Sequence, residues 1–167
     1  MLQSLISVFY RYLYTLSTTP TTNTTIIIIN YFIKKATRRL STLKIICNQK
    51  LLANKIGIVQ KAINSKTTLD LLKGVLIVTK QDEIVLKGYD LEIGIEYIIN
   101  DCKVEEQGAT VVNAIMFTEI IRRLPDTEIV ITLNENNLLV IECEGSLYKL
   151  ATMNPDEFPE LPKINIE

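Results

Sequence analysis

A repeated order of expected elements between residues 44 and 167 limits the fold more than any other feature. The first unit has a strand at 44–49, a helix at 50–63, and strands at 73–80, 83–89 and 90–100. The second unit has a strand at 109–113, a helix at 114–124, and strands at 127–134, 137–145 and 146–152. Two successive β-α-β-β-β units predict an α+β domain in which each helix covers one face of an antiparallel sheet.

The helix expected at 50–63 has one apolar and one polar face. Its apolar residues are spaced by four, three and four positions, which places them on one side of a helix: Leu52, Ile56, Val59 and Ile63. Lys50 and Lys61 fall on the opposite side, together with Asn54, Gly57 and Asn64.

The helix expected at 114–124 follows the same rule. Asn113 is a suitable N-cap, and Pro125 is expected to end the helix. The residues expected on its buried face are Met116, Phe117, Ile120, Ile121 and Leu124.

The strand expected at 90–100 has Leu91, Ile93 and Ile95 on one side and the acids Asp90, Glu92 and Glu96 on the other. We interpret these acids as the solvated face of a sheet. Asp90 with Glu92, or Glu105 with Glu106, has the chemistry of an acid–base pair or a magnesium site. No third convergent group and no glycine-rich phosphate loop accompanies them, so the sequence favours a non-catalytic domain without cofactor or metal.

The histidine and cysteine content further restricts the catalytic and metal-binding chemistry that the chain can support. The sequence contains no histidine, so the commonest general base and the commonest metal ligand are missing. The three cysteines, Cys47, Cys102 and Cys143, form no C-x-x-C pair, which argues against a zinc site or a disulfide framework. We expect buried free thiols in a reducing cytosol.

Residues 1–43 differ in composition from the rest. They contain five basic residues and no acid, are rich in Thr and Ile, and are expected to be a low-complexity, disordered leader. The other 13 basic and all 19 acidic residues lie in 44–167, which gives that part a net charge of −6. The apolar runs of the leader fall short of the roughly 18 residues that a membrane helix needs.

Three interpretations of this leader remain open. The first is translation from upstream of the true start: Arg38-Arg39 encoded AGG-AGG would be a ribosome-binding sequence, and Leu43 encoded TTG would be the start codon. Other codons at these positions would exclude it. A transit peptide and a genuine tail are the other two. The composition change close to Leu43 favours the first.

Four motifs in 44–167 resemble the bacterial DNA polymerase III beta subunit, the replicative sliding clamp. They are SKTTLDLLKGVLI, LKGYDLEIGI, FTEIIRRLP and LATMNPDEFPELP, in the order and spacing of that family's first domain. The resemblance implies a sliding-clamp (DNA clamp) domain with antiparallel sheets outside and two helices inside. It identifies 44–167 as domain 1, without the family's domains 2 and 3.

The resemblance also implies a function. Six such domains close into a ring around duplex DNA and tether the replicative polymerase, without catalysis. The DNA-contacting residues implied are Lys50, Lys61, Lys66, Arg122 and Arg123. Tyr148 and Leu150, on the last strand, would meet a second subunit.

The partners implied are double-stranded DNA of any sequence, a second clamp subunit and, through the complete protein, the polymerase and the clamp loader. The resemblance implies a location in the bacterial cytoplasm, at the nucleoid, and no membrane partner.

Two departures from the family pattern are visible. Ala114-Ile115-Met116 stands where relatives often carry basic residues, and Asp70 replaces a common proline. Because the sequence ends after one domain, two alternatives stay open: a stand-alone module that interacts or interferes with a complete clamp, and a non-functional truncated fragment.

Overall fold

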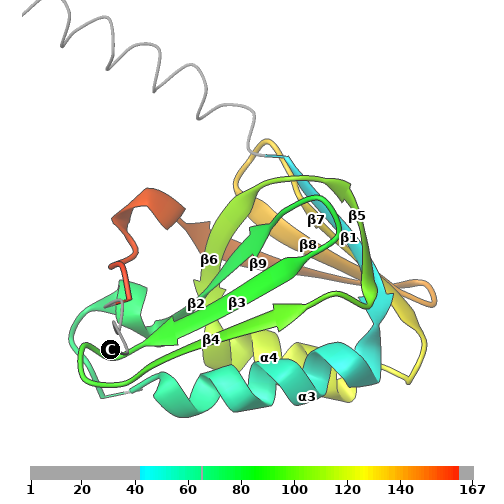
Figure 1. The fold of residues 1–167 in the computed structure, drawn as a ribbon. Coiled ribbons are helices and arrows are strands. Elements are labelled where there is room, and N and C mark those ends of the chain that lie inside the picture. Colours follow the sequence, from blue (N-terminus) through cyan, green and yellow to red (C-terminus); the bar gives the residue numbers. More distant parts are fainter. Residues whose placement is uncertain (1–41, 65, 162–167) are drawn as a thin grey trace, which may run out of the picture. The chain divides into compact units, whose positions relative to one another are not determined.

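The computed structural model describes residues 42–64 and 66–161 (Figure 1). The first unit contains β1 (Leu43–Asn48), α3 (Gln49–Val59), β2 (Gly74–Thr79), β3 (Ile84–Tyr89), β4 (Gly94–Ile99) and β5 (Cys102–Glu106). The second contains β6 (Ala109–Asn113), α4 (Ala114–Arg123), β7 (Glu128–Leu133), β8 (Leu138–Cys143) and β9 (Ser146–Met153). Short 3-10 turns lie at Gln60–Ala62, Asp70–Lys73 and Pro155–Glu157.

The predicted order of two β-α-β-β-β units is confirmed, with one additional strand, β5. The predicted leader lies outside the described residues up to position 41, whereas Leu43 is already the first residue of β1.

The nine strands form one antiparallel sheet in the order β4-β3-β2-β6-β9-β8-β7-β1-β5. The first strand of each unit is exchanged: β1 pairs with β7, and β6 pairs with β2. One half of the sheet therefore combines β4, β3 and β2 of the first unit with β6 of the second, and the other combines β9, β8 and β7 of the second unit with β1 and β5 of the first. The sequence pattern predicts strands but not their partners, so this exchange was not predicted.

The last strand of each unit passes from one half of the sheet to the other. β9 pairs with β8 through residues 146–151 and with β6 through Thr152 and Met153. In the first unit two separate strands make the corresponding pairings. β4 pairs with β3 in one half of the sheet, and β5 pairs with β1 in the other. Together β4 and β5 are thus the counterpart of β9, separated by the exposed residues Asn100 and Asp101.

Both helices begin at an asparagine cap. The Asn48 side chain accepts a hydrogen bond from the Leu51 amide at 3.1 Å, and the Asn113 side chain accepts one from the Met116 amide at 3.0 Å. Such bonds satisfy amides that have no partner inside the helix. The predicted cap at Asn113 is confirmed. Helix α4 ends at Arg123, because Leu124, immediately before Pro125, has an extended backbone conformation.

The two helices lie side by side and antiparallel below the sheet (Figure 1). At one end, Gln49 of α3 donates from Nε2 to the carbonyl of Ile121 in α4 at 2.5 Å. At the other end, a small pocket of about 160 Å³ is lined by Gln60, Ile63, Lys73, Asn113 and Ile115. Because Gln49 is buried, its hydrogen bond fixes how α3 lies against α4.

The core fills the space between the sheet and the helices. Its largest fully buried side chains come from both helices and from both halves of the sheet: Phe117, Leu43, Ile45, Leu52, Ile56, Ile77, Ile84, Leu86, Ile121, Ile129, Ile131 and Leu139. The buried positions predicted for α3 at Leu52, Ile56 and Val59 are confirmed.

Two details of the predicted core are wrong. Met116 was expected to be buried but is 55% exposed, because Ala114 and Thr118 face the sheet in its place. Leu91 and Ile93 are exposed because residues 90–93 form a turn and β4 begins only at Gly94. In that turn Leu91 has a φ of 78°.

We predict that Phe117→Ala will lower the free energy of unfolding by about 3–5 kcal/mol, because it leaves a cavity in a fully buried site. The neighbouring Met116→Ala removes a mostly exposed side chain and should change it by less than about 0.5 kcal/mol. Urea unfolding of both variants gives the comparison. Equal losses would mean that α4 is rotated from the position described here.

Candidate nucleic-acid interface

Most of the charged residues on the two helices are basic. The segments 49–62 and 114–123 contain five basic residues, Lys50, Lys55, Lys61, Arg122 and Arg123, and one acid, Glu119. The rest of 44–167 therefore holds 18 of the 19 acidic residues against eight basic ones. The surface formed by the exposed sides of α3 and α4, hereafter the helix surface, is thus basic on an otherwise acidic domain.

Arg122 connects the two helices across this surface. Its guanidinium lies against Gly57 of α3, so close that a Cβ at Gly57 would come within 3.0 Å of Arg122 Nη2. Gly57 had been placed on the polar face of the helix, and the structure supplies a reason for glycine there. Its missing side chain leaves room for the guanidinium of Arg122.

Lys50 and Arg123 have exposed acidic neighbours. Lys50 Nζ lies 3.7 Å from Asp126 Oδ2, and Arg123 Nη2 lies 3.8 Å from Glu119 Oε2. All four side chains are more than half exposed. Ion pairs of this kind contribute little in water, so both cations can exchange their carboxylate for a phosphate at small cost.

Lys61 and Lys66 lie towards the other end of α3. Lys61 is exposed in the 3-10 turn that extends the helix. Lys50 and Lys61 are separated by eleven residues, which corresponds to about 16 Å along a helix. With Lys66 in the loop that follows, the predicted DNA-contacting residues are spread along the helix surface rather than gathered in one cluster.

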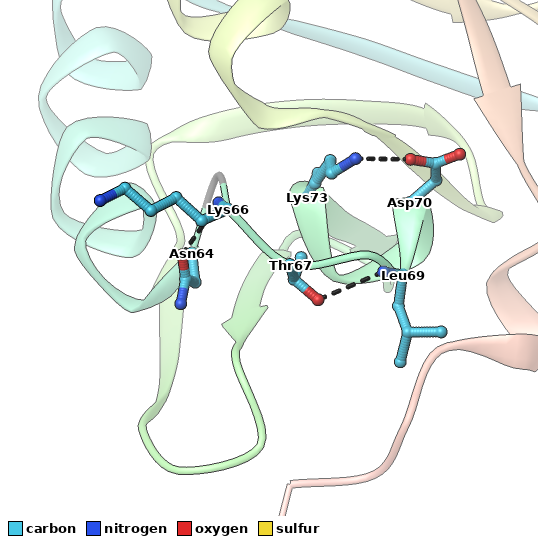
Figure 2. A network of polar contacts seen from close by, with 6 residues as sticks. All are labelled: Asn64, Lys66, Thr67, Leu69, Asp70 and Lys73. Atoms are coloured by element: carbon cyan, nitrogen blue, oxygen red, sulfur yellow. Dashed lines mark hydrogen bonds and ion pairs between the residues drawn. The ribbon is translucent and has the colours of Figure 1, made fainter.

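The backbone around Lys66 is fixed by short polar contacts (Figure 2). The Lys66 amide donates to Asn64 Oδ1 at 2.9 Å, and the Leu69 amide donates to Thr67 Oγ1 at 3.2 Å. Figure 2 shows the Lys66 side chain extending away from these contacts. The Lys66 ammonium group therefore extends from a backbone amide that is held by a local hydrogen bond.

Asp70, which replaces the family's proline, begins the 3-10 turn of the same loop. Lys73 Nζ donates to Asp70 Oδ1 at 2.7 Å (Figure 2), and this hydrogen bond lowers the pKa of Asp70. The expectation that this replacement affects the loop more than the function fits an exposed pair that holds the turn together.

Three apolar side chains interrupt the basic surface. Ile58 is 38% exposed, Ile115 40% and Met116 55%. Ile115 and Met116 are the positions where basic residues were expected from the family. The helix surface is therefore less basic at the start of α4 than the resemblance alone implied.

The carboxylates considered for catalysis have structural partners. Asp90 lies in the β3–β4 turn, where its Oδ1 accepts from the amides of Ile93 at 2.7 Å and Glu92 at 3.0 Å, and these bonds lower its pKa. Glu96 pairs with Lys87 on the neighbouring strand at 2.5 Å. The expectation that Asp90 and Glu92 share a strand face is wrong, because both precede β4.

Glu105 lies between two lysines on the edge of the sheet. Its carboxylate accepts from Lys103 Nζ at 2.7 Å and contacts Lys44 Nζ at 2.8 Å. These two hydrogen bonds lower the pKa of Glu105 to about 2. An acid with so low a pKa is ionised throughout the neutral range and is a poor proton donor.

The candidate interface residues on β9 differ in burial. Tyr148 is 39% exposed, and its neighbour Leu147 is 55% exposed. Leu150 is only 3% exposed and belongs to the core, because it faces Leu139 across the β8–β9 pair. Leu150 would therefore contribute its backbone, and not its side chain, to the predicted contact with a second subunit.

Two polar contacts of the helices were not predicted. The Gln49–Ile121 hydrogen bond joins α3 to α4, and Lys55 Nζ donates to the Tyr97 hydroxyl at 2.6 Å. Lys55 is partly buried against β4 and contributes less to the helix surface than its charge suggests. Neither residue type nor spacing indicates these partners, which are more than 40 positions away in the chain.

The described residues contain neither a candidate metal site nor a candidate membrane-spanning helix. Across 42–64 and 66–161, no group of three or more His, Cys, Asp or Glu side chains is placed to hold a metal ion. In the same part of the chain, no helix has the length and apolar character needed to cross a membrane.

Two β-α-β-β-β units with exchanged first strands, above two antiparallel helices with a basic surface, define a sliding-clamp domain. Residues 43–162 match the family model of the DNA polymerase III beta subunit, N-terminal domain. The chain therefore belongs to the DNA polymerase III beta subunit family.

The relatives are beta sliding clamps. The protein from Halalkalibacterium halodurans is 31% identical over 124 residues, which cover 70% of this chain and 33% of the relative. The one from Staphylococcus epidermidis strain RP62A is 33% identical over 119 residues, or 67% of this chain and 32% of the relative. The solved DNA polymerase sliding clamp of Bacillus subtilis has a TM-score of 0.71 at 30% identity, covering 74% of this chain and 34% of that one. The chain thus spans about a third of the length of its relatives.

We predict that Glu105 contributes to stability in a defined pH window. A carboxyl whose folded pKa of about 2 lies below its ordinary value of 4.5 stabilises the fold above pH 4.5, and this contribution is lost as the pH falls towards 2. The stability difference between the unmodified protein and Glu105→Gln should therefore be full above pH 4.5 and shrink below it, as measured by urea unfolding between pH 2 and 7.

Lys103→Met provides the control. Removal of this cation should raise the folded pKa of Glu105 towards 4.5, so the loss below pH 4.5 should be smaller and should be complete at a higher pH than in the unmodified protein. An unchanged pH profile in this variant would show that Lys103 does not hold the carboxylate in solution.

Proposed function

We propose that this domain forms part of a ring that encircles duplex DNA and keeps the replicative polymerase on its template. The observation that carries the proposal is the separation of charge: the two helices hold five basic residues and one acid, while the rest of the domain is strongly acidic. A basic surface admits a phosphate backbone, and an acidic exterior repels it. The residues proposed to contact DNA are Lys50, Lys61, Lys66, Arg122 and Arg123.

The proposed contact with DNA is weak and independent of sequence. Lysine and arginine side chains on a helix surface bind phosphates, which carry no sequence information. Each phosphate neutralised changes the slope of log K against log salt by about −0.9, so five contacts give about −4.5. Binding of that kind falls steeply at physiological salt, and retention on DNA must come from closure of the ring.

The proposed role requires no catalytic group, and the carboxylates held by hydrogen bonds or ion pairs at Asp90, Glu96 and Glu105 fit that role. The partners proposed are double-stranded DNA, a second subunit of the same kind and, through the complete protein, the polymerase and the clamp loader. The location proposed is the bacterial cytoplasm, at the nucleoid.

The free edge of β9 is the proposed contact with the second subunit. Among the described strands, residues 146–151 pair only with β8, so one row of backbone groups remains available to a strand of the partner. Tyr148 and Leu147 are exposed beside this edge. Strand addition of this type uses the backbone for affinity and flanking side chains for specificity.

We predict that Lys66→Glu, Arg122→Glu and Arg123→Glu together will reduce the affinity for short linear duplex DNA at low salt at least tenfold, when tested in a complete three-domain protein that carries this domain. Replacement by alanine should flatten the salt slope for short linear duplex DNA by about 0.9 per lost contact. Filter binding at several salt concentrations measures the slope.

Lys80→Glu is the matched control, because Lys80 is exposed in the β2–β3 turn, away from both helices. It should leave the affinity for linear duplex DNA and the salt slope unchanged. Equal effects of Lys80→Glu and of the helix-surface variants would mean that only net charge matters, and the proposed interface would be wrong.

We predict that Tyr148→Asp in the same complete protein will weaken ring closure at least tenfold, because it places a charge beside the β9 edge. Gln81→Asp adds the same charge in the exposed β2–β3 turn and should leave closure unchanged. Sedimentation velocity over a concentration series measures both. A Tyr148→Asp protein that closes as tightly as the control would exclude this edge.

A further inference from the structure

Two of the three cysteines lie directly opposite each other on neighbouring strands. Cys47 in β1 is paired in register with Cys102, the first residue of β5. Side chains of residues paired in this way point to the same face of the sheet. Cys47 is 3% exposed within the core, and Cys102 is half-buried and packs against the core. The two thiols are therefore neighbours, although they are far apart in the sequence.

The backbone geometry of this pair suits a disulfide. Directly opposite residues of antiparallel strands have Cα atoms about 4.5–5.5 Å apart, and disulfides form when this distance is about 4.4–6.8 Å. The Cβ atoms of such pairs are about 4.5–5.5 Å apart and must approach to about 3.5–4.5 Å. Cys102 follows the exposed residues Asn100 and Asp101, and a strand end is where so small a shift costs least.

The two thiols are not equivalent. Interaction with the neighbouring Cys47 thiol lowers the pKa of Cys102, whereas interaction with Cys102 and burial raise the pKa of Cys47. Cys102 is also the more exposed of the two. A thiolate that is both accessible and stabilised by a donor reacts first with an oxidant.

We propose that Cys47 and Cys102 are a reversible redox pair that is oxidised to a disulfide by hydroperoxides. In the first step the Cys102 thiolate attacks a peroxide oxygen, the O–O bond breaks, and Cys102 becomes a sulfenic acid. In the second step Cys47 attacks that sulfur, the S–S bond forms, and the sulfenic oxygen leaves as water. Overall, two thiols lose two electrons and two protons, and one hydrogen peroxide becomes two molecules of water.

Cys143 is not part of this pair. It is buried in β8, lies 3.4 Å from Thr127 Oγ1, and is separated from β1 by β7. The disulfide would fasten β5 to β1, the strand beside which β5 lies at the end of the sheet. Because Cys102 is only half-buried, a reductant can reach the bond, and accessible disulfides are the more easily reduced ones. The pair is therefore suited to reversible oxidation.

The test uses the full 167-residue chain, reduced, purified and treated with hydrogen peroxide under native conditions. After denaturation and alkylation, mass spectrometry should find one labelled cysteine in place of three and a Cys47–Cys102 cross-linked peptide. Dithiothreitol should restore three labels. The oxidised chain should melt roughly 5 °C or more above the reduced chain, since a cross-link restricts the unfolded state.

Two variants separate this pair from other thiol chemistry. Cys143→Ala should still form the disulfide and lose both remaining labels, whereas Cys102→Ser should form no intramolecular disulfide and show no rise in melting temperature. Three labels after peroxide treatment, a cross-link that includes Cys143, or oxidation of Cys102 to the sulfinic acid without a disulfide would each overturn the proposal.

Discussion

The exchange of first strands between the two units is the constraint on which the rest of the structure depends. Because β1 pairs with β7 and β6 pairs with β2, each helix must carry the chain from one half of the sheet to the other. Helix α3 leads from the β7 side to β2, and α4 leads from the β2 side to β7. Two helices that cross the same sheet in opposite directions must lie antiparallel, and the Gln49–Ile121 hydrogen bond joins them at one end.

The shared helix surface is a direct consequence of this arrangement. Separately, each helix presents only two or three cations, but side by side they present five against one acid. Charges within about 10 Å of one another act together at moderate salt, so the two helices form one electrostatic surface. Arg122 adds to this by crossing to Gly57 on the other helix. The opposite charges of the two helices and of the rest of the domain are the basis of the proposed orientation towards DNA.

Periodicity in the sequence was sufficient for the helices and most strands, because both depend on local spacing. It could not predict the strand exchange or the Cys47–Cys102 pair, since alternation indicates a face and never a partner. β5 was missed because Lys103, Glu105 and Glu106 leave it little apolar signal at the sheet edge. Met116 was misplaced because it lies on the flank of the apolar stripe, where spacing alone does not decide burial. The burial of Leu150 was not predicted for the same reason, since an edge strand still turns half its side chains inward.

The split of β9 explains why this sheet stays open to a partner. A strand that stayed with β8 along its whole length would leave the two halves unconnected, and one that paired with β6 throughout would close the edge. β9 does neither, because only Thr152 and Met153 reach β6. The inward Leu150 anchors the strand in the core, while residues 146–151 keep one edge unpaired among the described strands. Since backbone groups are the same in every strand, the proposed contact with a second subunit at that edge would take its specificity from the exposed side chains beside it, Leu147 and Tyr148.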